Sequence, residues 1–485
     1  MESVKKRFVS MSPSAKSSIA LFFASLVSSG ISYIITPIYT RILPAEIYGQ
    51  TPVFMTWFNL IGIIAMFGLA NGVFNNGMAD WPEKRDEYSF SMLILSNLIT
   101  LITGIILCIG FPLFRSFFQI DRKYILLMLA LFLFQPAYNF WAVRQRYEYK
   151  YKYVVIWTII CATVSPAIAI FAITADGGKD PLAARVFGAE IPLLLIYGLF
   201  YIHIARKAQY RINRKYWKAA LLFNLPLIPH YLSLHMLSSS DRIMISYLVN
   251  DNATAYYSVA YSVATLATMA WAAINSSLIP YTYENCKKGN FRAVNQATKP
   301  IIGIFAIICI TVIMLAPEIV SIMAAPNYMQ AIYAIPPIAG GVFFQIQYFM
   351  YANVVYYYKK PKYVMAASVV STLVNIGLNY IFIRRYGYIA AGYTTLACYM
   401  IQAGMDYYAM RKVTKEKIYD GKLILTLSAL VCAVSMASNL FYHLQAVRYV
   451  IAAGTIITII AFRKKIFASI SRVKKKDFKP GEERD

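Results

Sequence analysis

The sequence predicts an all-α polytopic membrane protein with about fourteen transmembrane helices, arranged as two six-helix lobes plus two C-terminal helices. Of the 485 residues, 59% are hydrophobic and only 14% are charged, whereas an average soluble domain is about 25% charged. The apolar residues gather in runs that are long enough for spanning helices of roughly 20 residues. These runs are continuous rather than alternating, and lipid tolerates only helices or closed barrels, so helices are expected.

The apolar runs, taken in order, define the expected spans. The first run follows several basic residues, as in a signal peptide, but it is too long for one and no small-residue cleavage site follows, so we interpret it as a retained span. The last run is short, and Arg448 and Arg463 are expected to snorkel at its two ends. The runs cover residues 17–39, 50–72, 88–111, 124–143, 153–174, 186–205, 219–240, 254–283, 300–323, 332–356, 363–383, 388–410, 423–442 and 449–462.

The basic residues predict the orientation of these spans. With the N-terminus in the cytoplasm, 37 of the 47 Lys and Arg residues fall on the cytoplasmic side and ten on the other side. This bias is the one expected from the positive-inside rule. It predicts a multi-pass membrane protein with both termini in the cytoplasm and an even number of spans, with twelve as the alternative to fourteen. The basic tail, residues 463–485, is expected to bind anionic membrane lipids rather than nucleic acid.

Metal and disulfide chemistry are not indicated. The six cysteines and four histidines show no spacing typical of a metal site or a disulfide framework. Most of the cysteines lie inside apolar runs, where cysteine behaves as a small hydrophobic residue. We therefore expect no metal and no cofactor.

Few ionisable side chains interrupt the apolar runs, and each costs about 2.5–3.5 kcal/mol at the centre of a spanning helix, which favours a functional role. Arg41 closes the first run, Glu190 lies in the sixth, and Asp241-Arg242 interrupts the seventh. An anchor at the membrane interface is an equal alternative for Arg41. A self-paired interfacial charge is the alternative for Asp241-Arg242.

Other polar residues fall near or within the runs. Glu318 and Asp406 lie near span ends, where ordinary boundary residues are expected. Asparagines join helices by hydrogen bonds, and together they would suit a hydrated cavity that contacts sugar hydroxyls. These asparagines are Asn71, Asn75, Asn76, Asn139, Asn224, Asn275, Asn375 and Asn379.

The two halves of the chain share a weak pattern. In each, a proline-bearing helix is followed by an arginine, an apolar stretch, and a tyrosine before a small residue: Arg41 with Tyr48 in the first half, and Arg242 with Tyr257 in the second. Internal repeats are usual in transporters. We therefore predict one six-helix lobe at 1–210, a second at 211–415, two additional helices at 416–462, and a cytoplasmic tail at 463–485.

These residues give the chain a resemblance to a known family. Arg41-Ile42-Leu43-Pro44 leading to Tyr48-Gly49, Asn224 and Pro226 leading to Asp241-Arg242, and the following Tyr257-Ser258 resemble the polysaccharide-biosynthesis (Wzx-type) flippases of the multidrug/oligosaccharidyl-lipid/polysaccharide exporter superfamily.

The resemblance implies a flippase that moves undecaprenyl-pyrophosphate-linked oligosaccharide across the cytoplasmic membrane by alternating access, for O-antigen, capsule or exopolysaccharide synthesis. A basic cavity, with Arg41 and Arg242, would receive the pyrophosphate. We expect Tyr48, Tyr257, Asn224 and Asn275 to line this cavity, with Asp241 and Glu190 as candidates for ion coupling. The implied partners are the lipid-linked oligosaccharide, membrane lipids, a polysaccharide polymerase and a chain-length regulator.

Three alternatives are weighed against this function. A lipid II flippase of the same superfamily shares the arginine-lined cavity and differs only in cargo. A multidrug or cation antiporter typically uses an acid in its first helix, whereas residues 17–39 contain no Asp or Glu. An integral glycosyltransferase or polymerase would need paired carboxylates or a large outer loop, and neither is found, so no catalytic residue is assigned.

Overall fold

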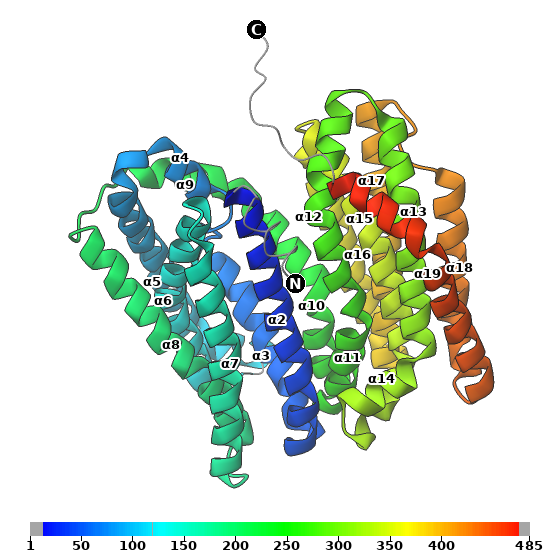
Figure 1. The fold of residues 1–485 in the computed structure, drawn as a ribbon. Coiled ribbons are helices and arrows are strands. Elements are labelled where there is room, and N and C mark those ends of the chain that lie inside the picture. Colours follow the sequence, from blue (N-terminus) through cyan, green and yellow to red (C-terminus); the bar gives the residue numbers. More distant parts are fainter. Residues whose placement is uncertain (1–12, 119, 475–485) are drawn as a thin grey trace, which may run out of the picture. The chain divides into compact units, whose positions relative to one another are not determined.

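The computed structural model describes residues 13–118 and 120–474, and within these ranges every regular element is a helix (Figure 1). This confirms the predicted all-α fold. Ten of the described helices are long and apolar enough to cross a membrane, or eleven if the bent stretch from Asp251 to Lys287 counts as one span. Helices also cover the remaining predicted runs, so each of the fourteen runs coincides with helical structure. The N-terminal basic residues and the end of the tail lie outside the described residues.

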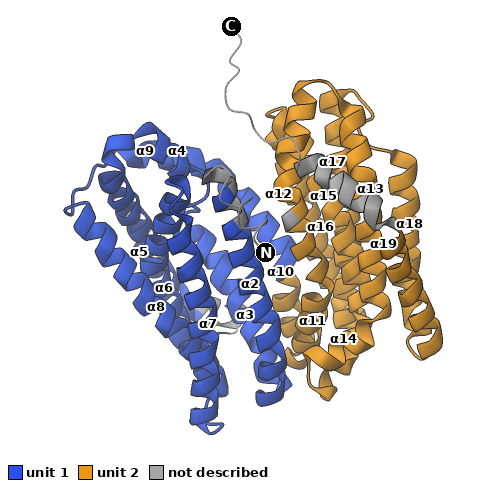
Figure 2. Cartoon of the chain, viewed as in Figure 1, with its two compact units in different colours: residues 1–239 blue, residues 240–485 orange. Residues whose placement is uncertain are grey.

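The chain divides into two compact units, Met1–Ser239 and Ser240–Asp485, coloured separately in Figure 2. The division falls within one helix, α10, whereas the predicted boundary lay between residues 210 and 211. The first unit contains α2 (Pro13–Ile42), α3 (Ala45–Ala65), α4 (Val73–Asp80), α5 (Arg85–Phe118), α6 (Arg122–Tyr147), α7 (Tyr151–Asp176), α8 (Pro181–Lys207), α9 (Lys215–Asn224) and the first half of α10 (Ile228–Leu248), with 3-10 turns η1 (Pro82–Lys84) and η2 (Leu225–Leu227).

The second unit begins with the rest of α10 and includes the two C-terminal helices, which both pack on α13. Its further elements are α11 (Asp251–Ala264), α12 (Leu266–Lys287), α13 (Phe291–Met314), α14 (Ala316–Met323), η3 (Pro326–Tyr333), α15 (Ile335–Tyr357), α16 (Pro361–Tyr386), α17 (Tyr388–Thr414), α18 (Gly421–Phe441) and α19 (Gln445–Lys474).

Short polar side chains define where several helices begin. The side chains of Asp180, Asn250, Asn290 and Asp420 each accept a hydrogen bond from the backbone N–H three residues later, at the starts of α8, α11, α13 and α18. Such N-caps satisfy a backbone donor that has no partner within the helix. The sequence thus specifies these boundaries locally.

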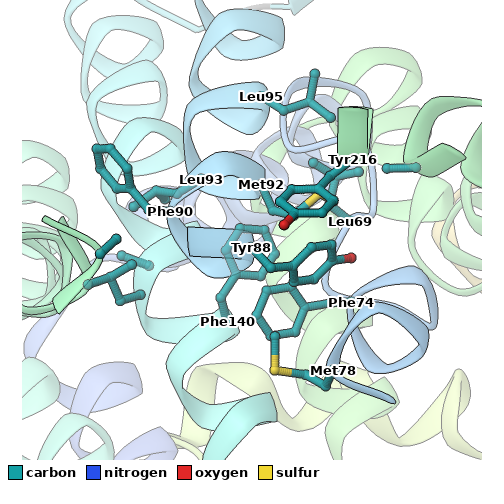
Figure 3. Packing of buried hydrophobic residues seen from close by; sticks show 14 of the residues in the cluster. Leu69, Phe74, Met78, Tyr88, Phe90, Met92, Leu93, Leu95, Phe140 and Tyr216 are labelled. Carbon is teal, nitrogen blue, oxygen red and sulfur yellow. The ribbon is translucent and has the colours of Figure 1, made fainter. Parts of the chain in front are cut away.

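A hydrophobic cluster rich in aromatic rings lies between α4, α5, α6, α8 and α9 of the first unit (Figure 3). Phe74 stacks on Phe140 with ring centroids 4.5 Å apart, and the buried Tyr88 hydroxyl donates to the Val73 carbonyl over 3.1 Å. Gly77 makes this packing sterically feasible, because a Cβ there would lie 2.0 Å from the Tyr88 ring. The absence of a side chain lets α4 and α5 approach closely.

Arg448 corrects one expectation. Rather than snorkelling, its side chain is buried, donates to the Met314 carbonyl over 3.0 Å, and forms an ion pair with Glu318 over 2.8 Å. A buried guanidinium needs such partners, because leaving it unpaired in an apolar interior is costly. The ion pair fixes α19 to α13 and α14. The side chain of Arg463 lies outside the described side chains.

Candidate functional site

Asp241 of α10 is fully buried and forms the centre of a polar network in the second unit. Its carboxylate accepts hydrogen bonds from the Tyr257 hydroxyl at 2.5 Å, the Asn379 amide at 2.6 Å and the Thr395 hydroxyl at 2.8 Å. These partners belong to α11, α16 and α17, so the network joins four helices. Charge-assisted hydrogen bonds of this kind are roughly twice as strong as neutral ones.

A second layer of hydrogen bonds orients the Asn379 amide. Its nitrogen also donates to the Asn375 side-chain oxygen at 3.1 Å, and its oxygen accepts from the Thr394 hydroxyl. The Asn375 nitrogen in turn donates to Thr395 at 3.4 Å. One carboxylate surrounded by amide and hydroxyl groups can hold a proton or a monovalent cation. Among the described residues, no three His, Cys, Asp or Glu side chains gather to form a metal centre.

Arg242 lies beside this network, half-buried, with its guanidinium over the Tyr261 ring at 4.4 Å from the ring centroid. Tyr261 hydrogen-bonds to Tyr399, whose hydroxyl accepts from the Gln345 amide at 3.2 Å. A cation over an aromatic face is stabilised by the ring quadrupole. The structure therefore brings together three predicted residues: Asp241, Arg242 and Tyr257.

The hydrogen bond of the Asn275 side chain is to a residue outside the Asp241 network. Its side-chain oxygen accepts from the Asn353 amide at 2.8 Å, which links α12 to α15. Interhelical amide bonds of this kind hold spanning helices together. The structure thus gives Asn275 a joining contact.

In the first unit, two predicted residues lie near an arginine to which the sequence analysis assigned no role. Arg185 lies in α8, and its guanidinium stacks on the Tyr39 ring of α2 at 3.7 Å. Glu190 and Tyr48 are its other electrostatic neighbours. With the described residues Arg185 makes no hydrogen bond and no ion pair within 4 Å. Its donors are therefore available to an anion.

The start of α8 explains why Arg185 lies on a helix. Asp180 caps the helix and Pro181 occupies its first position, the combination that favours helix initiation. Asp180 also forms an ion pair with Lys123 at 2.5 Å. The hydrogen bonds from Lys123 and from the Ala183 N–H lower the pKa of the Asp180 carboxyl, so it is ionised at neutral pH.

Arg41 and Asn224, by contrast, contact the backbone of their own unit. Arg41 is exposed at the end of α2 and donates to the Pro37 carbonyl at 2.9 Å. Asn224 is fully buried and donates to the Phe67 carbonyl at 3.2 Å. Phe67 has a positive φ of 53°, a conformation uncommon for a bulky residue. Asn224 thus stabilises the turn between α3 and α4.

An amide-lined pocket of about 190 Å³ lies beside this turn, between α3, α6 and the first half of α10. Two of the asparagines noted in the sequence, Asn71 and Asn139, line this pocket together with Asn59 and Gln135. The Gln135 side-chain oxygen is buried and has no hydrogen-bond partner among the described residues. A small polar pocket with an unused acceptor suits a hydroxyl-rich ligand or ordered water.

Asp406 does not fit the prediction of an ordinary boundary residue. Its side chain is fully buried in α17, which continues to Thr414. Glu318, at the start of α14, is the partner of Arg448 and therefore has a structural role. In sequence the two acids look alike, and only the packing distinguishes them.

The sequence analysis did not identify two residues of these sites, Arg185 and Thr395. Arg185 could have been found from the Asp180-Pro181 helix start, which places it five residues before Glu190 on one helix. Thr395 shows no local signal, because it becomes significant only through its hydrogen bond to Asp241, 154 residues away in the sequence. A residue defined by tertiary contacts cannot be recognised from one sequence.

Family models match most of this region. The model described as Polysaccharide biosynthesis protein matches residues 14–285, more than half of the chain, and the MatE model matches residues 226–381. Protein 1 of the Lsg locus of Haemophilus influenzae is 24% identical over 372 residues, which are 74% of this chain and 89% of that protein.

Solved structures show the same fold at low sequence identity. An inward-facing multidrug resistance MATE family transporter of the MOP superfamily superposes with a TM-score of 0.64 at 15% identity, over 80% of this chain and 95% of its own. The lipid II flippase MurJ, in an inward closed conformation, gives a TM-score of 0.64 at 15% identity, over 92% of this chain and 99% of its own. These structures share the fold of this chain, and the family model, which matches more than half of its length, shows that the chain belongs to the polysaccharide biosynthesis protein family.

Proposed function

We propose that this transporter moves an undecaprenyl-pyrophosphate-linked oligosaccharide from the cytoplasmic to the outer leaflet of the bacterial cytoplasmic membrane. The observation that best supports this is the pair of half-buried arginines stacked on tyrosine rings, Arg185 on Tyr39 and Arg242 on Tyr261. Arg185 lies in the first unit and Arg242 in the second. The cargo would serve O-antigen, capsule or exopolysaccharide synthesis.

The chemistry of the cargo explains why arginine is needed. A pyrophosphate headgroup cannot cross hydrocarbon unaided, because the desolvation of an unpaired charge is prohibitive. Guanidinium groups offer planar, bidentate hydrogen bonds to phosphate oxygens. Arg185 has unused donors, and the Tyr39 ring holds its guanidinium in place without consuming them. The polyprenyl chain would remain in lipid.

Arg41 is a further phosphate candidate in the first unit, with a different environment. Its guanidinium is exposed and bonded to its own helix, so it would receive the headgroup at the membrane surface. Tyr48 lies near Arg185, and Asn139 lines the amide pocket. These groups would contact the phosphates and the glycan during the same alternating-access cycle. The positive-inside bias supports cytoplasmic termini.

Asp241 is the candidate for coupling cargo movement to an ion. Its carboxylate is held by three donors from three helices, so any change in its protonation or cation occupancy alters contacts between those helices. Glu190 has the corresponding place beside Arg185 in the first unit. An ion bound differently in two conformations shifts the balance between them.

The test is cargo translocation in proteoliposomes that contain the purified full chain. Three labelled cargoes are compared: undecaprenyl-pyrophosphate oligosaccharide, lipid II and a lipophilic cation. The proposal predicts rapid translocation of the oligosaccharide and little of the cation. Preference for lipid II over the oligosaccharide would instead establish a cell-wall flippase. Preference for the cation would establish an antiporter.

A further inference from the structure

Two fully buried polar side chains on α17 have no hydrogen-bond partner. Both carboxylate oxygens of Asp406 and both polar atoms of the Gln402 amide lack a partner among residues 13–118 and 120–474. The two residues are four apart and therefore lie on the same helix face, one turn from each other. Native proteins pair nearly all buried polar groups, so this concentration calls for an explanation.

A third unpartnered group, within the described part of the chain, lies at the same level on the neighbouring helix α16. Only Gly387, with a φ of 72°, separates α16 from α17, so the two packed helices run antiparallel. The Thr394 hydroxyl donates to Asn379 and fixes their register. Eight residues before Asn379 on α16 is Ser371, and eight residues after Thr394 on α17 is Gln402. Because the helices run antiparallel, Ser371 and Gln402 lie at the same level. The Ser371 hydroxyl is also fully buried and has no partner within the described part of the chain.

This group of residues is separate from the Asp241 network. Thr395, which donates to Asp241, is eleven residues before Asp406 on α17, a rise of about 16 Å along the helix. Asp241 accepts from three donors, whereas Asp406 accepts from none of the residues that the structure describes. The two acids therefore lie at different depths along α17 and in different environments.

The surroundings of Asp406 contain no positive charge that would keep it ionised. Tyr348 of α15 is an electrostatic neighbour of Asp406, and the buried α16 residues at its level, Val364, Ala367 and Ser368, are not titratable. No Lys, Arg or His forms an ion pair with it among the described residues. A buried carboxylate without a partner is far less stable than the neutral acid.

We propose that Asp406, with Gln402 and Ser371, forms a proton-binding site in the second unit, distinct from Asp241. A neutral carboxyl gains a donor and can exchange hydrogen bonds with the adjacent amide and hydroxyl, directly or through water. The proton leaves when Asp406 becomes accessible to water. The idea that this proton drives cargo movement rests on the proposed function. The protonation of Asp406 itself does not depend on that function.

Infrared difference spectroscopy tests the site itself. The purified full chain in lipid is compared with Asp406→Asn, and Glu416→Gln, which removes an exposed carboxylate just beyond α17, is the matched control. The wild-type protein is expected to show a protonated carboxyl C=O band at neutral pH that is lost at alkaline pH and absent from Asp406→Asn. Absence of this band at neutral pH would overturn the proposal. Its loss on replacing choline with Na⁺ would do so too, since the occupant would then be a metal cation.

Transport provides the second readout. In proteoliposomes, Asp406→Asn is expected to lose a measurable part of the acceleration by a pH gradient while retaining cargo exchange at equilibrium, and Glu416→Gln is expected to keep both. A full pH-gradient response in Asp406→Asn would exclude proton coupling through this residue. Failure of the wild-type protein to move the oligosaccharide would reject the proposed cargo and leave the infrared result intact.

Discussion

Removing the Asp241 carboxylate is expected to destabilise the second unit by an amount that can be worked out from its contacts. Asp241→Ala leaves three buried donors, on Tyr257, Asn379 and Thr395, without their acceptor. A buried donor left unpaired costs about 1–3 kcal/mol, and polar contacts within membranes fall near the low end of that range. The free energy of unfolding should therefore fall by about 3 kcal/mol.

Asp241→Asn separates the loss of charge from the loss of shape. Its side-chain oxygen still accepts a hydrogen bond, and the Tyr257 and Thr395 hydroxyls can rotate to accept from its nitrogen. We expect a loss of about 1 kcal/mol. The assay is reversible unfolding in mixed micelles with increasing denaturing detergent, with Glu416→Gln as the control. Wild-type stability in Asp241→Ala would refute the assigned network.

Three further predictions follow from local geometry. Gly77→Ala should cost about 1–3 kcal/mol in the same unfolding assay, because its Cβ meets an aromatic ring at 2.0 Å, whereas Gly198→Ala, with nothing within 4 Å, should cost much less. Asn353→Leu should cost about 1 kcal/mol by removing the hydrogen bond to Asn275, and a double-mutant cycle with Asn275→Leu should recover that coupling. Since the pKa of Asp180 is lowered in the folded state, its stabilising effect should be present at neutral pH and lost as pH falls through and below the ordinary carboxyl range near about 4. Thermal unfolding of Asp180→Asn should therefore differ from wild type at neutral pH and converge with it in acid.

The fold could be predicted from sequence because its main determinants are local. Apolar runs of spanning length, N-caps such as Asp180 and Asn250, and the glycine between α16 and α17 each act within a few residues. In lipid, helix formation also satisfies the backbone without help from other segments. These local signals placed helices over every predicted run.

The candidate site could be predicted only in part, for a physical reason. Asp241 and Arg242 were found because a charge within an apolar run is costly wherever it lies. Asn379 was noted only as one of many asparagines, and Thr395 was not considered, since their importance comes from contacts with a helix far away in the sequence. Asp406 was misjudged because its distance from a span end says nothing about which helices cover it.

The most direct test of the account is the translocation rate of undecaprenyl-pyrophosphate oligosaccharide in variants of the two stacked arginines, Arg185 and Arg242. Losing one charge-assisted contact of about 1.5–3 kcal/mol should slow translocation at least about tenfold. At equal membrane abundance, Arg185→Ala and Arg242→Ala should each show this loss, and the lysine variants should recover part of the rate. Wild-type rates in both alanine variants would contradict a headgroup path through these residues.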